Sequence, residues 1–366
     1  MKDHYEVLEV PPNASPEKIK EQYRFLIHAW HPDKFPNPTQ KAKAEEKIKE
    51  INAAYEVVGD PLKRRQYDKE HFAQTQPWYP QEGTMSYQAE ISRSNPTLFV
   101  FLLDQSGSMS AQFGGQPSGT SKANGVADAI NRMLSNLVIR CSQGEIIRDY
   151  FEIAILGYGA QERQVAPALS GPLSGRDIVK ISEIGNSPAR VEDRVLKQPD
   201  VAGGVIDMSI KFPIWFESVV NGDTPMCQVL QRAHQLVGNW IRAHRGAFPP
   251  IVINLTDGEA TDGDPFPYAQ DLMKLSTDDG SILLFNCHLS STVGERVLYP
   301  ESAASIPDQY GKKMFEMSSM LTPTMVEFAK KQGFAVGEKS RGFVFQADLV
   351  DVIRFLDIGT RPKELR

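Results

Sequence analysis

The chain has 366 residues, a formal net charge of −6 and three cysteines. The length suits two or three domains, and the modest acidic balance gives no indication of a basic nucleic-acid-binding surface. The amino terminus carries charges instead of a signal-peptide core, and no apolar run reaches the length of a membrane span. The cysteines are few, odd in number and widely spaced, which favours a reducing compartment over a disulfide framework: Cys141, Cys227 and Cys287. We therefore expect a cytoplasmic protein with no nucleic-acid or membrane partner.

The first seventy residues carry equal numbers of basic and acidic side chains and show two helical repeats. Apolar residues recur at helical spacing in each: Ile19, Tyr23, Leu26 and Trp30, then Ala44, Ile48, Ile51, Tyr55 and Val58. Pro32 disfavours helical geometry at the residue before it and so ends the first helix. The pattern predicts two amphipathic helices that pair antiparallel, with His31-Pro32-Asp33 in their connection.

This segment resembles a J domain, the module by which co-chaperones activate DnaK-type ATPases. The resemblance is carried by residues 5–8, His31-Pro32-Asp33, residues 49–57, Asp60-Pro61 and residues 65–68. It implies a small all-α helical hairpin over residues 1–70 and a DnaK-type chaperone as partner. The residues expected to contact that chaperone form one helix face and the loop after it: Lys20, Arg24, His28, His31, Pro32 and Asp33. Phe25 and Ala29 stand where basic residues are common in the family, so we expect a thin basic face and weak affinity.

Residues 71–95 are rich in Gln, Pro and Gly and predict a linker. From residue 96 to 362, apolar runs alternate with helical patterns. Strands are expected at 97–103, 151–157, 250–256, 281–287 and 342–346, and helices at 122–138, 225–244, 266–275, 322–332 and 348–356. Such alternation predicts a doubly wound, mainly parallel, Rossmann-like α/β sheet with helices on both faces.

The segment of about 160–222 is rich in Gly, Pro and Ser and gives no clear pattern. Two interpretations stay open. It is either an insertion that shapes the rim of a site, or an ordinary connection that ends in a core aromatic cluster at residues 212–216.

Oxygen-bearing residues follow two of the predicted strands. Asp104, Ser106 and Ser108 come directly after the first strand, and Asp257 comes directly after the strand at 250–256. Thr224 precedes Pro225, and we expect it to cap the helix that starts there. Because parallel α/β sheets bind ligands at the carboxyl ends of their strands, these side chains should meet. Two carboxylates and three hydroxyls form a hard ligand set that suits Mg²⁺, Mn²⁺ or Ca²⁺ and not zinc.

The Asp-x-Ser-x-Ser motif, the later Thr and the later Asp together resemble the metal-ion-dependent adhesion site of von Willebrand factor type A (VWA) domains. In that family the two Ser and the Thr coordinate the ion, and the Asp residues bind it directly or through water. One coordination position is left for an acidic group of the ligand. The resemblance implies a protein partner that presents an exposed Asp or Glu.

Enzymatic motifs fit less well. Residues 114–122 resemble a phosphate loop only faintly, because Lys122 comes three places after the second glycine and not directly after it. Asp262 and Asp264 are expected to be solvated loop residues, with a second cation as the alternative. Cys227 should pack beneath the site as an unreactive thiol.

The sequence therefore predicts a non-enzymatic, bacterial co-chaperone or adaptor. Its J domain would recruit a DnaK-type chaperone, and its VWA domain would select a protein partner. One alternative is a VWA-based stress-signalling or assembly scaffold, associated with phosphatases or kinases and without chaperone coupling. The other is a metal-dependent hydrolase, although no general base accompanies the motif.

Overall fold

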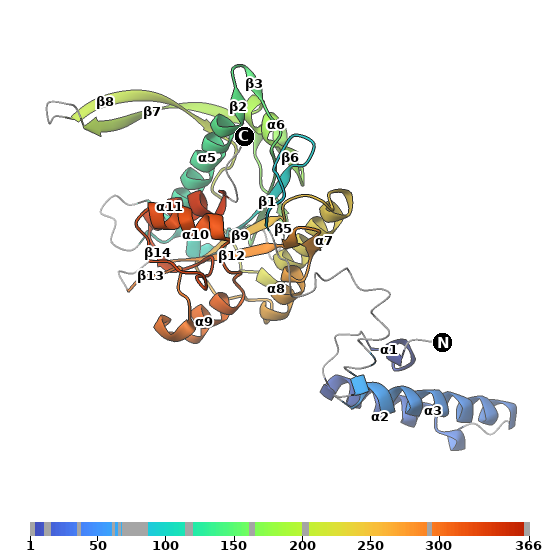
Figure 1. The fold of residues 1–366 in the computed structure, drawn as a ribbon. Coiled ribbons are helices and arrows are strands. Elements are labelled where there is room, and N and C mark those ends of the chain that lie inside the picture. Colours follow the sequence, from blue (N-terminus) through green and yellow to red (C-terminus); the bar gives the residue numbers. More distant parts are fainter. Residues whose placement is uncertain are drawn as a thin grey trace. The chain divides into compact units, whose positions relative to one another are not determined.

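The computed structural model describes residues 4–10, 16–34, 38–60, 63–64, 67, 87–113, 120–160, 165–199, 205–290 and 295–361. The chain forms two compact units, Met1–Trp78 and Tyr79–Arg366 (Figure 1). The predicted linker lies outside the described residues as far as position 86. Its last part belongs to the second unit, because the backbone N–H groups of Tyr87 and Gln88 donate to the carbonyl and Oδ1 of Asp279 at 3.2 and 2.8 Å.

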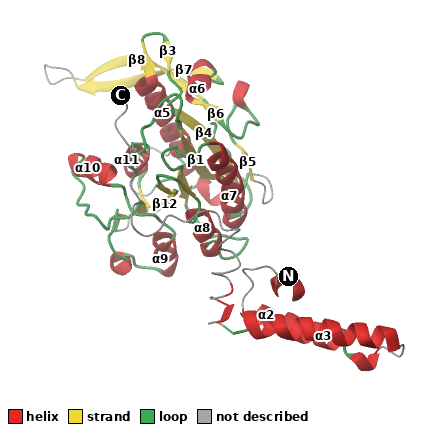
Figure 2. Ribbon diagram, turned by 45° about the vertical axis from the view of Figure 1, so that its right-hand side comes forward, coloured by secondary structure: helices red, strands yellow, loops and turns green. Residues whose placement is uncertain are grey.

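The first unit is helical, as predicted. Its elements are α1 (His4–Val7), α2 (Pro16–Ala29), the 3-10 helix η1 (Pro32–Lys34) and α3 (Pro38–Val58). Helices α2 and α3 lie side by side in both views (Figure 2). The repeating apolar residues face inward, with Ile19, Leu26 and Ile51 at most 2% exposed. Tyr23 and Tyr55 stack across the two helices with ring centroids 3.9 Å apart.

The second unit is built on one mostly parallel sheet. Its strand order is β13-β14-β12-β9-β1-β4-β5, and β6 also pairs with β4. The five parallel strands confirm the five predicted ones: β1 (Thr97–Asp104), β4 (Phe151–Tyr158), β9 (Ile251–Thr256), β12 (Leu283–Leu289) and β14 (Phe343–Ala347). The antiparallel additions are β5 (Val165–Pro167), β6 (Val179–Lys180) and β13 (Val297–Leu298).

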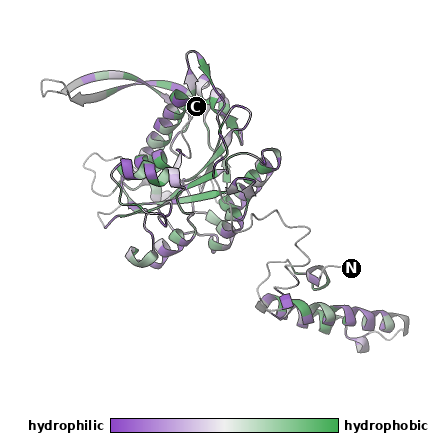
Figure 3. Ribbon diagram, viewed as in Figure 1, coloured by the Kyte–Doolittle hydropathy of each residue, from purple (hydrophilic) through white to green (hydrophobic). Residues whose placement is uncertain are grey.

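Helices cover both faces of this sheet. Phe99, Phe101 and Leu103 of β1 pack into the core beneath α5 (Lys122–Cys141), α10 (Pro323–Lys331) and α11 (Leu349–Gly359). Leu98, Val100 and Leu102 pack on the opposite side with α7 (Met226–Ala243) and α8 (Phe266–Met273). A strand buried on both faces reads as a continuous apolar run, which is why residues 98–103 show no alternation. Figure 3 shows hydrophobic residues concentrated in the central strands.

The segment at 160–222 forms more structure than its sequence suggested. It holds η3 (Gly171–Leu173), α6 (Ile181–Asn186) and a long antiparallel ribbon of β7 (Arg190–Pro199) and β8 (Val205–Ile214), which projects from the body of the unit (Figure 1). Trp215 and Phe216, directly after the ribbon, are 2% and 3% exposed. The Asn131 side chain of α5 accepts from both of their backbone N–H groups at 2.8 and 3.0 Å. The aromatic cluster is therefore part of the core.

The remaining short elements are η2 (Gly107–Ser110), β2 (Ser142–Gln143), β3 (Ile146–Ile147), β10 (Ser276–Thr277), β11 (Gly280–Ser281), η4 (Ala303–Ser305) and α9 (Gln309–Glu316). In the part of the chain that the structure describes, no helix is both long and apolar enough to span a bilayer.

Candidate metal centre

The predicted oxygen ligands meet where the strand order reverses. The chain leaves β1 through α5 and returns as β4 on one side of β1, whereas β9 lies on the other side. Crevices at such reversals, at the carboxyl ends of parallel strands, are the usual ligand sites of open α/β sheets. Asp104 is the last residue of β1, and Asp257 follows the last residue of β9.

Asp104 organises the loop after β1. Its Oδ1 accepts from the backbone N–H of Ser106 at 2.9 Å, and its Oδ2 accepts from the hydroxyl of Thr256 at 2.6 Å. The residue is 3% exposed. Burial raises the pKa of Asp104 to about 6, although the hydrogen bonds from Ser106 and Thr256 act in the opposite direction. A carboxylate held this way in a water-poor setting is stabilised by any nearby cation.

The two serines link Asp104's loop to Asp257. The hydroxyls of Ser106 and Ser108 lie 3.0 Å apart, and the Ser108 hydroxyl donates to Asp257 Oδ1 at 2.7 Å. Ser106 is buried and Ser108 is exposed. These contacts bring four of the five predicted ligands into one continuous cluster, open to solvent at Ser108.

A residue outside the predicted ligand set also reaches the cluster. Lys122, the first residue of α5, places its Nζ 2.5 Å from Asp257 Oδ2. Both side chains are buried, at 3% and 0% exposed. Among the described residues, Asp257 Oδ2 accepts no hydrogen bond, and it forms an ion pair with the Lys122 ammonium. The Asp257 carboxylate is therefore already paired with a positive charge of the protein itself, the Lys122 ammonium.

Thr224 comes to the cluster on a third loop. The loop is tied to the first one by hydrogen bonds from Gly107 N to Gly222 O and from Asn221 N to Gln105 O, at 3.0 and 2.8 Å. A methyl group added at Gly258 would lie 3.6 Å from Thr224 Oγ1 and 4.0 Å from Ser108 Oγ. Both hydroxyls therefore border the same space above Gly258.

The predicted capping role of Thr224 was wrong. Pro225 is the N-cap of α7, and no side chain of the cap residue bonds to the helix. Instead Asp262 caps the helix from a neighbouring loop, accepting from the backbone N–H groups of Cys227 and Gln228 at 3.0 Å each. An acidic side chain here also complements the helix dipole. The Thr224 hydroxyl instead borders the space above Gly258.

The other acidic residues have structural contacts. Asp264 accepts from Lys313 of α9 at 3.0 Å and from the backbone N–H of Phe266 at 3.2 Å. Cys227 is buried. Burial is the main cause that raises the pKa of its thiol to about 12, and the negative charge of the nearby Asp262 adds to it. This placement agrees with the prediction of an unreactive thiol.

The donors fit a hard divalent cation. Two carboxylates and three hydroxyls converge, and all are oxygen ligands of the kind that Mg²⁺, Mn²⁺ or Ca²⁺ accepts. Among the described residues no group of three or more His, Cys, Asp or Glu is arranged to hold a metal, so the hydroxyls are essential to such a site. The Lys122 ammonium shows that the position against Asp257 accommodates positive charge.

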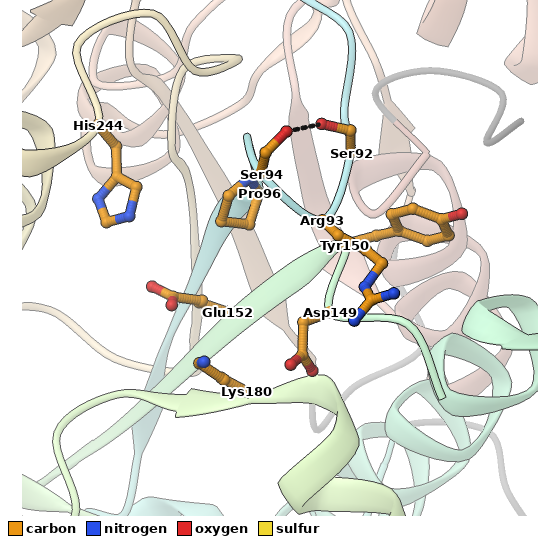
Figure 4. Close-up of a pocket in the computed structure, with 9 residues that line it drawn as sticks. All are labelled: Ser92, Arg93, Ser94, Pro96, Asp149, Tyr150, Glu152, Lys180 and His244. Carbon is orange, nitrogen blue, oxygen red and sulfur yellow. Dashed lines mark hydrogen bonds between the residues drawn. The ribbon is translucent and has the colours of Figure 1, made fainter. Parts of the chain in front are cut away.

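A pocket lies at the opposite ends of the parallel strands from the oxygen cluster (Figure 4). It has a volume of about 780 Å³ and is lined by residues at the amino ends of β1 and β4, including Pro96, Asp149, Tyr150 and Glu152. Glu152 accepts from the indole N–H of Trp240 at 2.6 Å, and Asp149 accepts from the backbone N–H of Ser182 at 3.1 Å. Both carboxylates thus hold neighbouring elements together, and none of the predicted site residues lies here.

The predicted chaperone-contact residues lie on and after α2. Lys20, Arg24, His28 and His31 are exposed, and Pro32 begins η1. Lys34 donates to His28 Nδ1 at 3.1 Å, which joins η1 to the same helix face. Phe25 is 61% exposed beside this face. Asp33 lies in η1, and its side chain is outside the described residues.

Comparison with known proteins assigns the first unit. The DnaJ domain family model matches residues 3–68. Residues 3–68 form a DnaJ domain. The chain is 54% identical over 82 residues to the chaperone protein DnaJ of Caldicellulosiruptor saccharolyticus, covering 22% of this chain and 20% of that protein. It is 40% identical over 98 residues to the chaperone protein DnaJ of Thermotoga maritima, covering 27% and 26%. The chain thus spans about a quarter or less of the length of these relatives.

Solved structures give weaker likenesses. The J domain of a mouse DnaJ-like protein is 29% identical, with a TM-score of 0.18, and covers 19% of this chain and 77% of that one. Human Sec24c is 10% identical over 56% of this chain and 28% of its own, with a TM-score of 0.28. Scores this low support no argument about a shared fold for the α/β unit.

Proposed function

We propose that the chain is a non-enzymatic co-chaperone or adaptor. Its DnaJ domain recruits a DnaK-type chaperone and stimulates that chaperone's ATPase. Its α/β unit is a VWA domain that binds a protein partner through a Mg²⁺-dependent adhesion site, with Mn²⁺ or Ca²⁺ as alternative ions. Joining the two modules in one chain raises the local concentration of the chaperone beside the bound partner without a new contact.

The match of residues 3–68 to the DnaJ domain carries the chaperone half of the proposal. The exposed Lys20, Arg24 and His28 support it, because a basic stripe steers an acidic partner surface towards the His31-Pro32-Asp33 connection.

The convergence of Asp104, Ser106, Ser108, Thr224 and Asp257 supports the partner half. When bound, the ion would supply an open coordination position for a carboxylate. Ser106, Ser108 and Thr224 would hold it, and Asp104 and Asp257 would balance its charge. The exposed Ser108 marks the side from which a partner's Asp or Glu would enter.

The chaperone half is tested by ATPase stimulation of the DnaK-type protein from the same cell. We expect the full chain to stimulate turnover and Asp33→Asn to abolish the stimulation. Lys18→Ala is a matched control on α2, because Lys18 is also an exposed basic residue and forms an ion pair with Glu21 at 2.9 Å, one helical turn away. If the wild-type chain gives no stimulation, the scaffold without chaperone coupling becomes the better account.

The partner half is tested by calorimetry with Mg²⁺ on the wild type and on Asp257→Ala. We expect the wild type to bind the ion and the variant to lose the heat of binding, because an anionic ligand is removed. Equal heats from both proteins would count against the site.

A further inference from the structure

The buried Lys122–Asp257 pair suggests how metal loading of the cluster is controlled, and this inference rests on the metal site proposed above. We infer that the Lys122 ammonium and the divalent ion are alternative partners of Asp257 Oδ2. Loading of the ion then expels Lys122 from the cluster. Lys122 would therefore set both the affinity and the selectivity of the site for divalent cations.

The contacts of Asp257 are the first support. Oδ1 is already satisfied by the Ser108 hydroxyl at 2.7 Å. Among the described residues, Oδ2 lies 2.5 Å from the Lys122 ammonium and accepts no hydrogen bond. A hard cation bound to the same oxygen, at the roughly 2 Å typical of Mg²⁺, would lie within a few ångströms of the ammonium. Two cations that close in a water-poor setting repel strongly, so both do not share one carboxylate oxygen.

The position of Lys122 in its helix is the second support. Lys122 is the first residue of α5, directly after the Ser121 N-cap, and the first turn of α5 carries no acidic side chain. The amino end of a helix is the positive end of its dipole and disfavours a cation. The ion pair with Asp257 offsets this unfavourable effect and stabilises the ammonium at that position. Once a divalent ion neutralises Asp257, the local field favours withdrawal of Lys122.

The stem of Lys122 allows such a withdrawal without disturbing the fold. The helix start is held independently, because Lys122 N donates to Ala111 O at 2.8 Å and Asn124 N donates to the Ser121 hydroxyl at 3.2 Å. Four rotatable bonds separate the ammonium from this anchored backbone. Only the side chain has to move.

The first test is Mg²⁺ titration of the full chain by calorimetry. We expect Lys122→Met to bind Mg²⁺ at least about tenfold more tightly than the wild type, since the ion no longer competes with the ammonium. Lys313→Met is the matched control, because it removes a Lys–Asp pair of 3.0 Å that is about half exposed on the neighbouring loop. Its affinity should equal that of the wild type.

The second test needs no variant. Brief acetylation with an amine-reactive ester, followed by mass spectrometry, should leave Lys122 protected without Mg²⁺ and several-fold more reactive at saturating Mg²⁺. Equal Mg²⁺ affinities of the wild type and Lys122→Met, or protection of Lys122 that does not change with Mg²⁺, would overturn the inference.

The outcomes separate this inference from the proposed function. If the affinity shift and the change in Lys122 reactivity are seen but no acidic protein partner binds with Mg²⁺, the proposed function fails and the inference stands. If neither the wild type nor Lys122→Met takes Mg²⁺, both fail.

Discussion

The ion pairs of the two units differ in their exposure to water. In the DnaJ domain, ion pairs such as Lys18–Glu21 and Lys63–Glu56 have side chains that are more than half exposed. In the α/β unit, Lys122 and Asp257 are 3% and 0% exposed. Water screens the first kind of pair and is excluded from the second. The difference teaches that charges on the DnaJ surface contribute little to folding stability, whereas the buried pair in the cluster at β1 and β9 couples charge to the stability of the fold.

The largest expected effect comes from separating the buried pair. Without a divalent ion, Lys122→Met leaves the Asp257 carboxylate buried and unpaired, and we expect the free energy of unfolding to fall by about 3–5 kcal/mol. Urea unfolding of the full chain at neutral pH measures this. Lys313→Met should cost less than about 1 kcal/mol, because its pair is exposed. Similar losses for the two variants would erase the contrast between buried and exposed pairs.

A neutral buried network should give the next largest effect. Asn254 accepts from the hydroxyl of Tyr158 at 2.8 Å and donates to Asn286 Oδ1 at 3.1 Å, and Asn254 is 0% exposed. Asn254→Leu leaves both partners short of a bond, so we expect a loss of about 2–3 kcal/mol in the same urea measurement. Asn239→Ala, which changes an exposed amide on α7, is the control and should be nearly neutral. A neutral Asn254→Leu would show that the network does not stabilise the sheet.

Exposed charges of the DnaJ domain should affect the rate of association with the DnaK-type chaperone and not the free energy of unfolding. Arg24→Ala is expected to leave the free energy of unfolding within about 0.5 kcal/mol of the wild type. It should slow association with the DnaK-type chaperone at low salt, and the difference should shrink as salt screens the charge. Surface plasmon resonance at two salt concentrations measures this. An effect of equal size at both concentrations would argue against steering.

The smallest effect concerns Cys227, a buried residue in the first turn of α7. With the pKa of its thiol raised to about 12 by burial, the thiolate is about one part in ten thousand at pH 8. We expect no alkylation of Cys227 by iodoacetamide in the folded chain and full alkylation in urea, read by mass spectrometry. Rapid modification of the folded protein would place the thiol at the surface.

Much of the architecture was predictable from local patterns. The strands of the parallel core carry continuous apolar runs, and helices α5 and α7 carry the 3.6-residue repeat, so both kinds of element were found near their true bounds. The β7–β8 ribbon was missed, although residues 206, 208, 210, 212 and 214 of β8 alternate as a strand should. Gly and Pro around it hid the signal, because both residues also mark loops.

The convergence of the predicted site residues could be expected from the sequence, whereas the ion pair of Asp257 with Lys122 could not. Asp104, Ser106, Ser108 and Asp257 were found because each follows a recognisable strand. The Lys122–Asp257 pair joins residues far apart in the chain, and no spacing rule reveals it. The available signal was a lysine directly after an N-cap serine with no acidic residue in the following turn. Asp262 was likewise read as a solvated residue because helix capping from another loop depends on tertiary packing.

The most direct test of the account is a pull-down from the native cell with the full chain, compared across Mg²⁺, chelator and two variants. The account predicts a small set of proteins that is recovered with Mg²⁺, lost with chelator, lost with Asp104→Ala and retained with His31→Gln. The DnaK-type chaperone should show the opposite dependence, lost with His31→Gln and retained with Asp104→Ala. If both variants lose the same proteins, the two units do not divide the work and the account is contradicted.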